Sequence, residues 1–238
     1  MTQAPTNTQA CDSQAGPMSG PMCRQLEVAP VEALAAMDWP DLVRRFAVSV
    51  EWFDPRMFHL PEQDLDTPFK PEAAAGLLPI RALVTHLADC EMVWLHRIRR
   101  AVAEQTPMLA NFDHDAFLDG PLYGRGTRSG VTSAPPVAGS VAVLHTMRRW
   151  ALDWLFDMDE ATQNRSAMHP ERGSMTVRDM LATTTWHLEH HAKLLNAKIE
   201  HLLGPLTEAP PMANIPEGGC GPGCGCASKQ AGGGDAQS

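Results

Sequence analysis

The sequence predicts an all-α fold, a four-helix bundle with long connections between its helices and disordered N- and C-terminal tails. Four stretches carry apolar residues at the three- and four-residue spacing of an amphipathic helix, and no stretch alternates as a strand would. Hydrophobic residues make up 44% of the 238 residues, which is enough to fill a core. Because amphipathic helices of about 20–28 residues bury their apolar stripes only against one another, four of them predict a bundle.

The first predicted helix spans about residues 31–53. Pro40 lies in the first turn of its main segment, after Asp38, where a missing backbone N–H is tolerated. Its apolar face consists of Leu34, Leu42, Phe46, Val50 and Phe53. The second predicted helix spans about residues 79–103 and has the same periodicity. Its apolar face consists of Leu83, Leu87, Cys90, Trp94 and Ile98.

The third predicted helix spans about residues 137–158. Its apolar face consists of Val141, Leu144, Leu152, Leu155 and Phe156. The fourth helix begins at Thr176, where the pattern Thr-x-x-Asp with Asp179 predicts a capping box for the first backbone amides. It ends before Gly204 and Pro205, which together form a good stop signal.

The composition divides the chain into three parts. Residues 1–30 are rich in small and polar residues, residues 207–238 are rich in Gly, Pro and Cys, and both are expected to be disordered tails. The part that folds is therefore residues 31–206. Its first two connections take about 25 and about 30 residues, against roughly 2–8 in a minimal up-down bundle. Connections of that length tend to carry short helices or to cover a site.

Charge and hydropathy exclude several classes of protein. The net charge is −9, from 19 basic and 28 acidic residues, which disfavours a nucleic-acid surface. No window approaches the roughly 18 consecutive apolar residues of a membrane span, and the N-terminus lacks the pattern of a secretory signal. The six cysteines are spread too unevenly for a disulfide framework. We therefore expect a cytoplasmic protein that binds neither nucleic acid nor membrane.

Two histidines of the fourth helix and one of the second form a candidate metal site. His187 and His191 are four residues apart, which places their Cβ atoms about 5–6 Å apart on one helix face. Their neighbours at helical spacing predict that this face points into the bundle, whereas His190 points elsewhere. His86 lies on the apolar face of the second helix and can meet the pair there. Three neutral imidazoles with one position left for water are typical of a catalytic rather than a structural zinc site.

The spacing of His187 and His191 also fits two polar residues near the end of a bundle. The pattern His-x-x-x-His is common, and chance pairs are expected among ten histidines. His86, far upstream on another apolar helix face, strengthens the metal hypothesis without proving contact. From the residues alone, both interpretations stay open.

Four segments together resemble the DinB-like family. They are residues 83–91, which contain the pattern His-Leu-x-Asp-x-Glu, and residues 111–117, 169–176 and 186–191. Their joint order and spacing are similar to those of the family, and the resemblance covers about residues 50–203. The two tails depart from the family pattern and inherit nothing from it.

The resemblance implies a four-helix bundle in which His86, His187 and His191 bind a divalent metal ion, often zinc or nickel in that family. It also implies a homodimer, because family members often dimerise. Known activities of relatives include transfer and isomerisation reactions with a low-molecular-weight thiol as cosubstrate. Many other members have no assigned reaction.

Five further residues near these motifs are interpreted as structural. We interpret Glu91 as a surface carboxylate paired with a basic neighbour rather than as a group that orients a metal ligand. Cys90 is expected to be a small buried residue rather than a nucleophile. Asp113 and Asp115 fit caps and turns, and His169 fits a loop position rather than that of a fourth ligand.

Two functions follow from these observations. The first is a metal-dependent transferase or hydrolase, in which the metal activates a small thiol or water toward a small-molecule substrate. The alternative is a noncatalytic metal-binding or stress-associated protein, whose flexible tail handles a soft metal ion. The cysteines of that tail are Cys220, Cys224 and Cys226. A bundle whose histidines never bind metal is the third alternative.

Overall fold

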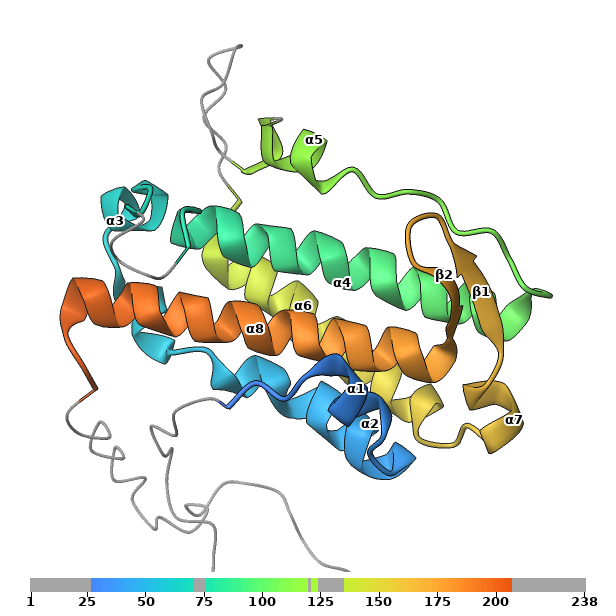
Figure 1. The fold of residues 1–238 in the computed structure, drawn as a ribbon. Coiled ribbons are helices and arrows are strands. Elements are labelled where there is room, and N and C mark those ends of the chain that lie inside the picture. The colour runs from blue at the N-terminus through green and yellow to red at the C-terminus, as the bar shows by residue number, and fades with distance from the viewer. Residues whose placement is uncertain (1–26, 71–75, 120, 124–134, 207–238) are drawn as a thin grey trace, which may run out of the picture. The chain divides into compact units, whose positions relative to one another are not determined.

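A computed structural model describes residues 27–70, 76–119, 121–123 and 135–206 of the chain (Figure 1). The predicted tails lie outside these residues, apart from the short stretch 27–30. The three tail cysteines Cys220, Cys224 and Cys226 therefore also lie outside the described residues.

Four long helices form the predicted bundle. They are α2 (Trp39–Val48), α4 (Ile80–Ala103), α6 (Val137–Leu155) and α8 (Val177–Leu203). α4 packs against α6 and α8, and α2 packs against the same two helices. α4 and α6 run in one direction and α2 and α8 run in the other (Figure 1). Since α4 and α6 are parallel neighbours, the chain has to return along the bundle between them, which explains the long connection.

The first predicted helix is divided in the structure. α1 (Val31–Ala35) ends first, α2 follows, and the 3-10 helix η1 (Ser49–Trp52) completes the segment. Pro40 lies in the first turn of α2, as predicted, with Asp38 as N-cap. Because Pro40 has no backbone N–H to continue a helix from α1, the segment predicted over residues 31–53 is divided there, and its main part begins at α2. The predicted apolar face is correct, since all five of its side chains are buried.

The other predicted helices match the structure closely, with one correction. α6 ends at Leu155, so Phe156, which is 42% exposed, does not belong to its apolar face. α8 begins with the predicted capping box, in which the backbone N–H of Asp179 donates to Thr176 Oγ1 and the backbone N–H of Thr176 donates to Asp179. Gly204 ends this helix with a φ of +78°, a conformation that glycine adopts without strain.

A β-hairpin adds two strands that the sequence did not predict. β1 (Ser166–His169) and β2 (Gly173–Thr176) pair antiparallel between α7 (Glu160–Gln163) and α8. Strands of four residues are too short to show a clear alternation. Backbone hydrogen bonds join the hairpin to the chain after α4, from Leu109 N–H to Met168 O and from Met168 N–H to Pro107 O.

Short helices occupy both long connections, as predicted. The first connection contains η2 (Pro55–His59) and α3 (Glu62–Asp66). The second contains α5 (His114–Asp119) and η4 (Pro121–Tyr123), and α5 packs against α4. The buried Tyr123 hydroxyl donates a 2.7 Å hydrogen bond to Asp89 on α4, which anchors η4 to the bundle.

A layer of polar side chains separates two apolar clusters in the core. One cluster contains Cys90 and Ile98 of α4 with Leu181 of α8, and the other contains Leu83 of α4 with Leu195 of α8. Buried polar residues occupy α4, α6 and α8 at the level between the two clusters. They include Glu91, Arg148, Thr184 and Thr185. No helix within the described residues is long and apolar enough to cross a membrane.

Candidate metal centre

The structure brings the three predicted histidines together. One ring nitrogen from each of His86, His187 and His191 lies within 4.8 Å of the other two. The His86 ring on α4 lies 5.4 Å from that of His187 and 5.5 Å from that of His191, measured between centroids. His190 precedes His191 on α8, but its ring stacks on Trp186 at 5.0 Å. His190 therefore points away from the triad, as predicted.

Burial keeps the three imidazoles neutral. It lowers the pKa of His86 to about 4, with a further contribution from His114. It lowers the pKa of His191 to about 3, with further contributions from His86 and His190. The pKa of His187 is lowered for the same reason and by the other two histidines. The neutral imidazole is the form that binds a metal ion, so the triad is ready to do so at neutral pH.

The donor atoms of the triad fit a divalent metal ion. His191 Nδ1 is buried and has no hydrogen-bond partner among the described residues. An unpaired buried polar atom costs about 1–3 kcal/mol, and a bond to a metal ion removes that cost. Imidazole nitrogens suit zinc, copper, iron and nickel, so the donor set alone does not choose between them.

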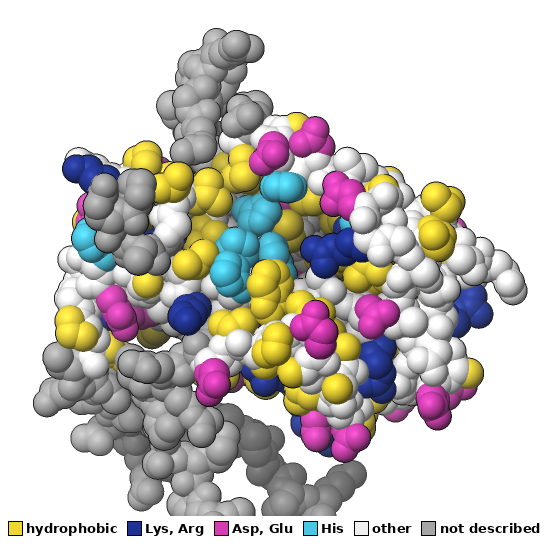
Figure 2. Space-filling view, viewed as in Figure 1, with side chains coloured by type: hydrophobic (Ala, Val, Ile, Leu, Met, Phe, Trp, Pro, Cys, Tyr) yellow, Lys and Arg dark blue, Asp and Glu magenta, His cyan; other side chains and the backbone are white. Residues whose placement is uncertain are grey.

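A fourth histidine, His114, lies beside the triad and was missed in the sequence. Its ring on α5 lies 6.4 Å from the His86 ring, and Figure 2 shows the histidines gathered on this face of the molecule. The two acids that flank it act locally, as predicted: Asp113 accepts from the backbone N–H of Ala116, and Asp115 is exposed. The family-like segment 111–117 pointed to this loop, but only the tertiary structure places His114 against α4.

Cys90 has the structural role that the sequence predicted, whereas His169 ends strand β1 and does not lie in the predicted loop. Cys90 is buried with its Sγ 3.5 Å from His86 Nε2. Burial, together with Asp89 and Glu91, raises the pKa of its thiol to about 12, so the thiol stays protonated. His169 lies on β1, stacks on Trp94 at 5.9 Å and lies outside the triad.

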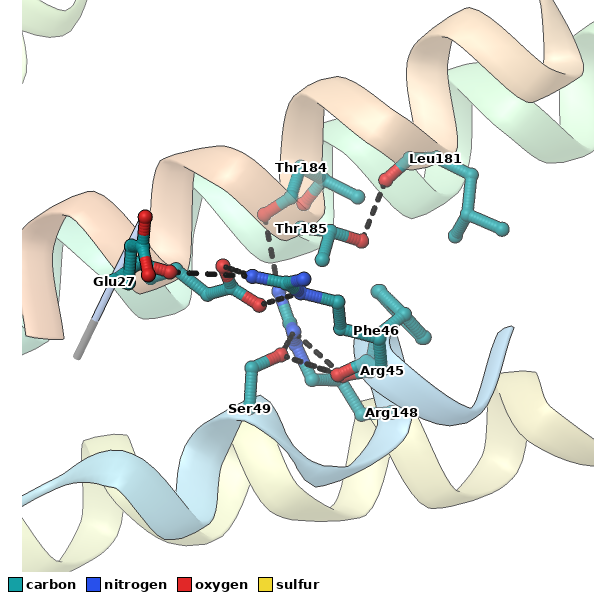
Figure 3. A network of polar contacts seen from close by, with 9 residues as sticks. Glu27, Arg45, Phe46, Ser49, Arg148, Leu181, Thr184 and Thr185 are labelled. Carbon is teal, nitrogen blue, oxygen red and sulfur yellow. Dashed lines mark hydrogen bonds and ion pairs between the residues drawn. The ribbon is translucent and has the colours of Figure 1, made fainter. Parts of the chain in front are cut away.

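The prediction of Glu91 as a surface carboxylate is wrong. Its side chain is buried in the polar layer, where it accepts a 2.7 Å hydrogen bond from Arg148 and one of 3.3 Å from the Thr184 hydroxyl. Arg148 also donates to the backbone oxygen of Phe46 and to Ser49 Oγ (Figure 3). Glu91 is therefore paired with a basic residue, as expected, but across the core rather than at the surface.

This buried network connects all four helices directly beneath the histidines. Arg45 on α2 adds two hydrogen bonds, of 2.7 and 2.8 Å, to the carboxylate of Glu189 on α8. Thr184 lies one helical turn before His187, and the positive charge of Arg148 helps to lower the pKa of His187. The network therefore fixes the relative positions of the helices that carry the triad.

Comparisons with known proteins agree with this fold and site. The model of the DinB superfamily matches residues 60–195. A Bacillus licheniformis protein described as a candidate metal-dependent hydrolase is 31% identical over 58% of this chain and 72% of its own. YfiT of Bacillus subtilis, named in the same way, is 27% identical over 56% of this chain and 67% of its own.

The solved structure of YfiT has the same fold. It superposes with a TM-score of 0.57 and 20% identity, and the match covers 68% of this chain and 86% of the YfiT chain. It is described as a four-helix bundle of unusual topology. The family match covers more than half of the chain and includes all three histidines. This protein is a member of the DinB superfamily.

Proposed function

We propose that this protein is a metal-dependent hydrolase that holds one divalent ion, zinc or nickel, on His86, His187 and His191 and acts on a small molecule. The observation that carries the proposal is the convergence of three neutral imidazoles, one of which has a buried nitrogen without a partner among the described residues. The names of the relatives in two Bacillus species support a hydrolytic reaction.

The nucleophile comes from outside the chain. Cys90 is the thiol nearest the triad among the described residues, and its raised pKa keeps it protonated and unreactive at neutral pH. A divalent ion on three imidazoles makes water, or a small thiol, available as a nucleophile near neutral pH. Water leads to hydrolysis, whereas a low-molecular-weight thiol leads to the transfer reaction that the sequence also predicted.

The surrounding residues hold the triad in position and leave one side accessible. His86 is buried against Cys90, while His187 and His191 are partly exposed. The ion pair of Glu91 and Arg148 holds α4 and α6 together below the site. Substrate can therefore approach from the side of the two partly exposed histidines. The predicted homodimer stays a prediction.

Elemental analysis of the full-length, tag-free protein tests the metal site. We expect about one equivalent of metal in the wild type and almost none in His187→Ala/His191→Ala. His190→Ala is the matched control, because His190 is adjacent in sequence but outside the triad, and it should keep the metal. A panel of ester, amide and thiol-transfer substrates, assayed with the metal-loaded protein, then decides between water and thiol.

A variant that ends at Leu206 separates the bundle site from the cysteines of the tail. Retention of the metal in this variant supports the histidine site. Loss of metal only on truncation would overturn the proposal and favour the noncatalytic protein with a metal-handling tail. Absence of metal from every form, even after reconstitution with zinc or nickel, would reject the three-histidine site.

A further inference from the structure

A cavity of about 330 Å³ lies along α4, beyond the histidine triad. Its apolar lining includes Met92 and Val93 of α4 with Leu109 and Phe112 of the following segment, and its basic lining includes Arg97 and Arg100. Among the residues that the structure describes, no acidic side chain lines it. A volume of this size is within the usual range for a small-molecule site, roughly 300–1,000 Å³.

Arg97 supplies a buried positive charge to this cavity. The residue is 6% exposed, its guanidinium lies over the ring of Trp94 at 4.9 Å, and its Nη2 donates a 2.9 Å hydrogen bond to the backbone oxygen of Ala110. It forms no ion pair within the described part of the chain. Burial lowers the pKa of Arg97, while Glu171 raises that pKa and Arg172 lowers it.

Arg100, on the rim of the same cavity, differs in this respect. Its guanidinium donates to both carboxylate oxygens of Glu104, at 2.7 and 2.6 Å, so its charge is already paired. Arginine has five N–H donors in a planar fork that matches a carboxylate or a phosphate. Because Arg97 commits one donor to Ala110 and none to an acid, the remaining donors can bind an anion.

We propose that this cavity binds a small amphipathic anion, a carboxylate or phosphate on an apolar stem, with the anionic group on Arg97. The apolar side chains of Met92, Val93 and Phe112 suit the stem. An anion here compensates a buried charge that has no acidic partner among the described residues.

The cavity and the triad both lie along α4, so one molecule can extend from one to the other. Val93 follows His86 by two helical turns, which is about 10 Å along α4. The segment from Leu109 to Phe112 lines the cavity and leads directly into α5, where His114 meets His86. Figure 2 shows Lys and Arg side chains across a hollow from the histidines. Assignment of the anion as part of the substrate rests on the proposed function, whereas the binding site itself does not.

Binding of three six-carbon probes to the full-length, metal-loaded protein tests the site. The probes are hexanoate, hexyl phosphate and the uncharged hexan-1-ol, and the methyl NMR signals of Leu109 report binding in the cavity. We expect at least one anion to bind about tenfold or more tightly than the alcohol, the factor typical of a hydrogen bond to a charged group. Preference for hexanoate or for hexyl phosphate identifies the anionic group. Equal binding of the alcohol would overturn the proposal.

Two pairs of variants show whether Arg97 is responsible. Arg97→Gln should weaken binding of the anion about tenfold or more, whereas Arg100→Gln should change it less than about twofold. Val93→Glu leaves Arg97 in place but puts a carboxylate one turn before it, where it pairs with the arginine and excludes the anion. Val93→Gln is the neutral control and should still bind. Unchanged binding in both Arg97→Gln and Val93→Glu would reject the site.

The histidine double variant separates this inference from the proposed function. His187→Ala/His191→Ala should lose the metal and still bind the anion. Metal binding without anion binding in the wild type would remove the Arg97 site and leave the proposed function intact. Anion binding in a protein that never takes up metal would support the Arg97 site and reject the proposed function.

Discussion

Arg148 on α6 donates a 2.7 Å hydrogen bond to the carboxylate of Glu91 on α4, with 0% and 2% of the two side chains exposed. The pair lies in the polar layer between the two apolar clusters and beneath the triad. Burial raises the pKa of Glu91, and the adjacent arginine opposes that change by favouring the charged form. The two residues therefore depend on each other, and their dependence can be measured.

Removal of one partner of this pair should destabilise the bundle strongly. Arg148→Met leaves the Glu91 carboxylate buried without its cation, which costs about 3–5 kcal/mol. The double variant Glu91→Met/Arg148→Met removes both charges and should lose clearly less than the sum of the two single variants. Urea unfolding of all four proteins measures the difference. Additive losses would show that the two side chains contribute independently.

Metal removal should lower the stability of the wild type. An ion that binds only the native state adds about 2.7 kcal/mol when its free concentration is 100 times its Kd. Chelator treatment should therefore lower the Tm of the wild type and of His190→Ala, and leave that of His191→Ala unchanged. The measurement is thermal unfolding with and without chelator. A chelator effect that persists in His191→Ala would place the ion elsewhere.

Acid should destabilise the metal-free protein through the triad. The pKa of His86 is about 4 and that of His191 about 3 in the folded chain, against an ordinary value of 6.5. As the pH falls below 6.5, the unfolded chain takes up protons that the native sites do not accept, so the free energy of unfolding decreases until the folded pKa values are reached. Above pH 6.5 these histidines add no pH dependence to the free energy of unfolding. Urea unfolding between pH 7 and 4 should show a shallower loss in His86→Asn/His191→Asn than in the wild type, and an equal loss would contradict the pKa shifts.

Lys198 should also make the free energy of unfolding rise with pH, but in the alkaline range. It is 1% exposed on α8 and donates to the backbone oxygen of Gly76 at 2.6 Å, with no ion pair among the described side chains. Burial lowers its pKa from 10.5 to about 8. Between these two values the unfolded chain holds the proton and the native chain does not, so stability rises with pH.

The variant Lys198→Met isolates this contribution, because it keeps most of the buried volume and removes the charge. The free energy of unfolding of the variant minus that of the wild type should be largest at pH 7. This difference should shrink between pH 8 and 10.5, because the wild type gains stability over that range. Unfolding by urea at four pH values checks this. A constant difference over the whole range would show that Lys198 titrates normally.

The sequence by itself determined the helices and part of the site. Thr176 and Asp179 cap α8, Gly204 ends it, and these signals act within a few residues, so they can be identified without knowing the fold. The separation of His187 and His191 follows from helix geometry alone. Helical periodicity also showed that His86 lies on the core-facing side of its helix. Periodicity alone did not show that His86 meets His187 and His191.

Only the tertiary structure decided which residues meet between helices. Arg148 was not singled out in the sequence, yet it is fully buried, and Glu91, Phe46 and Ser49 bind it from other helices. In the same way, α5 carries His114 to the ring of His86. Local preferences extend over one or two helical turns, whereas the burial of a charge depends on the segments that pack around it. Those segments are far apart in the chain, so their contacts exist only once the bundle has formed.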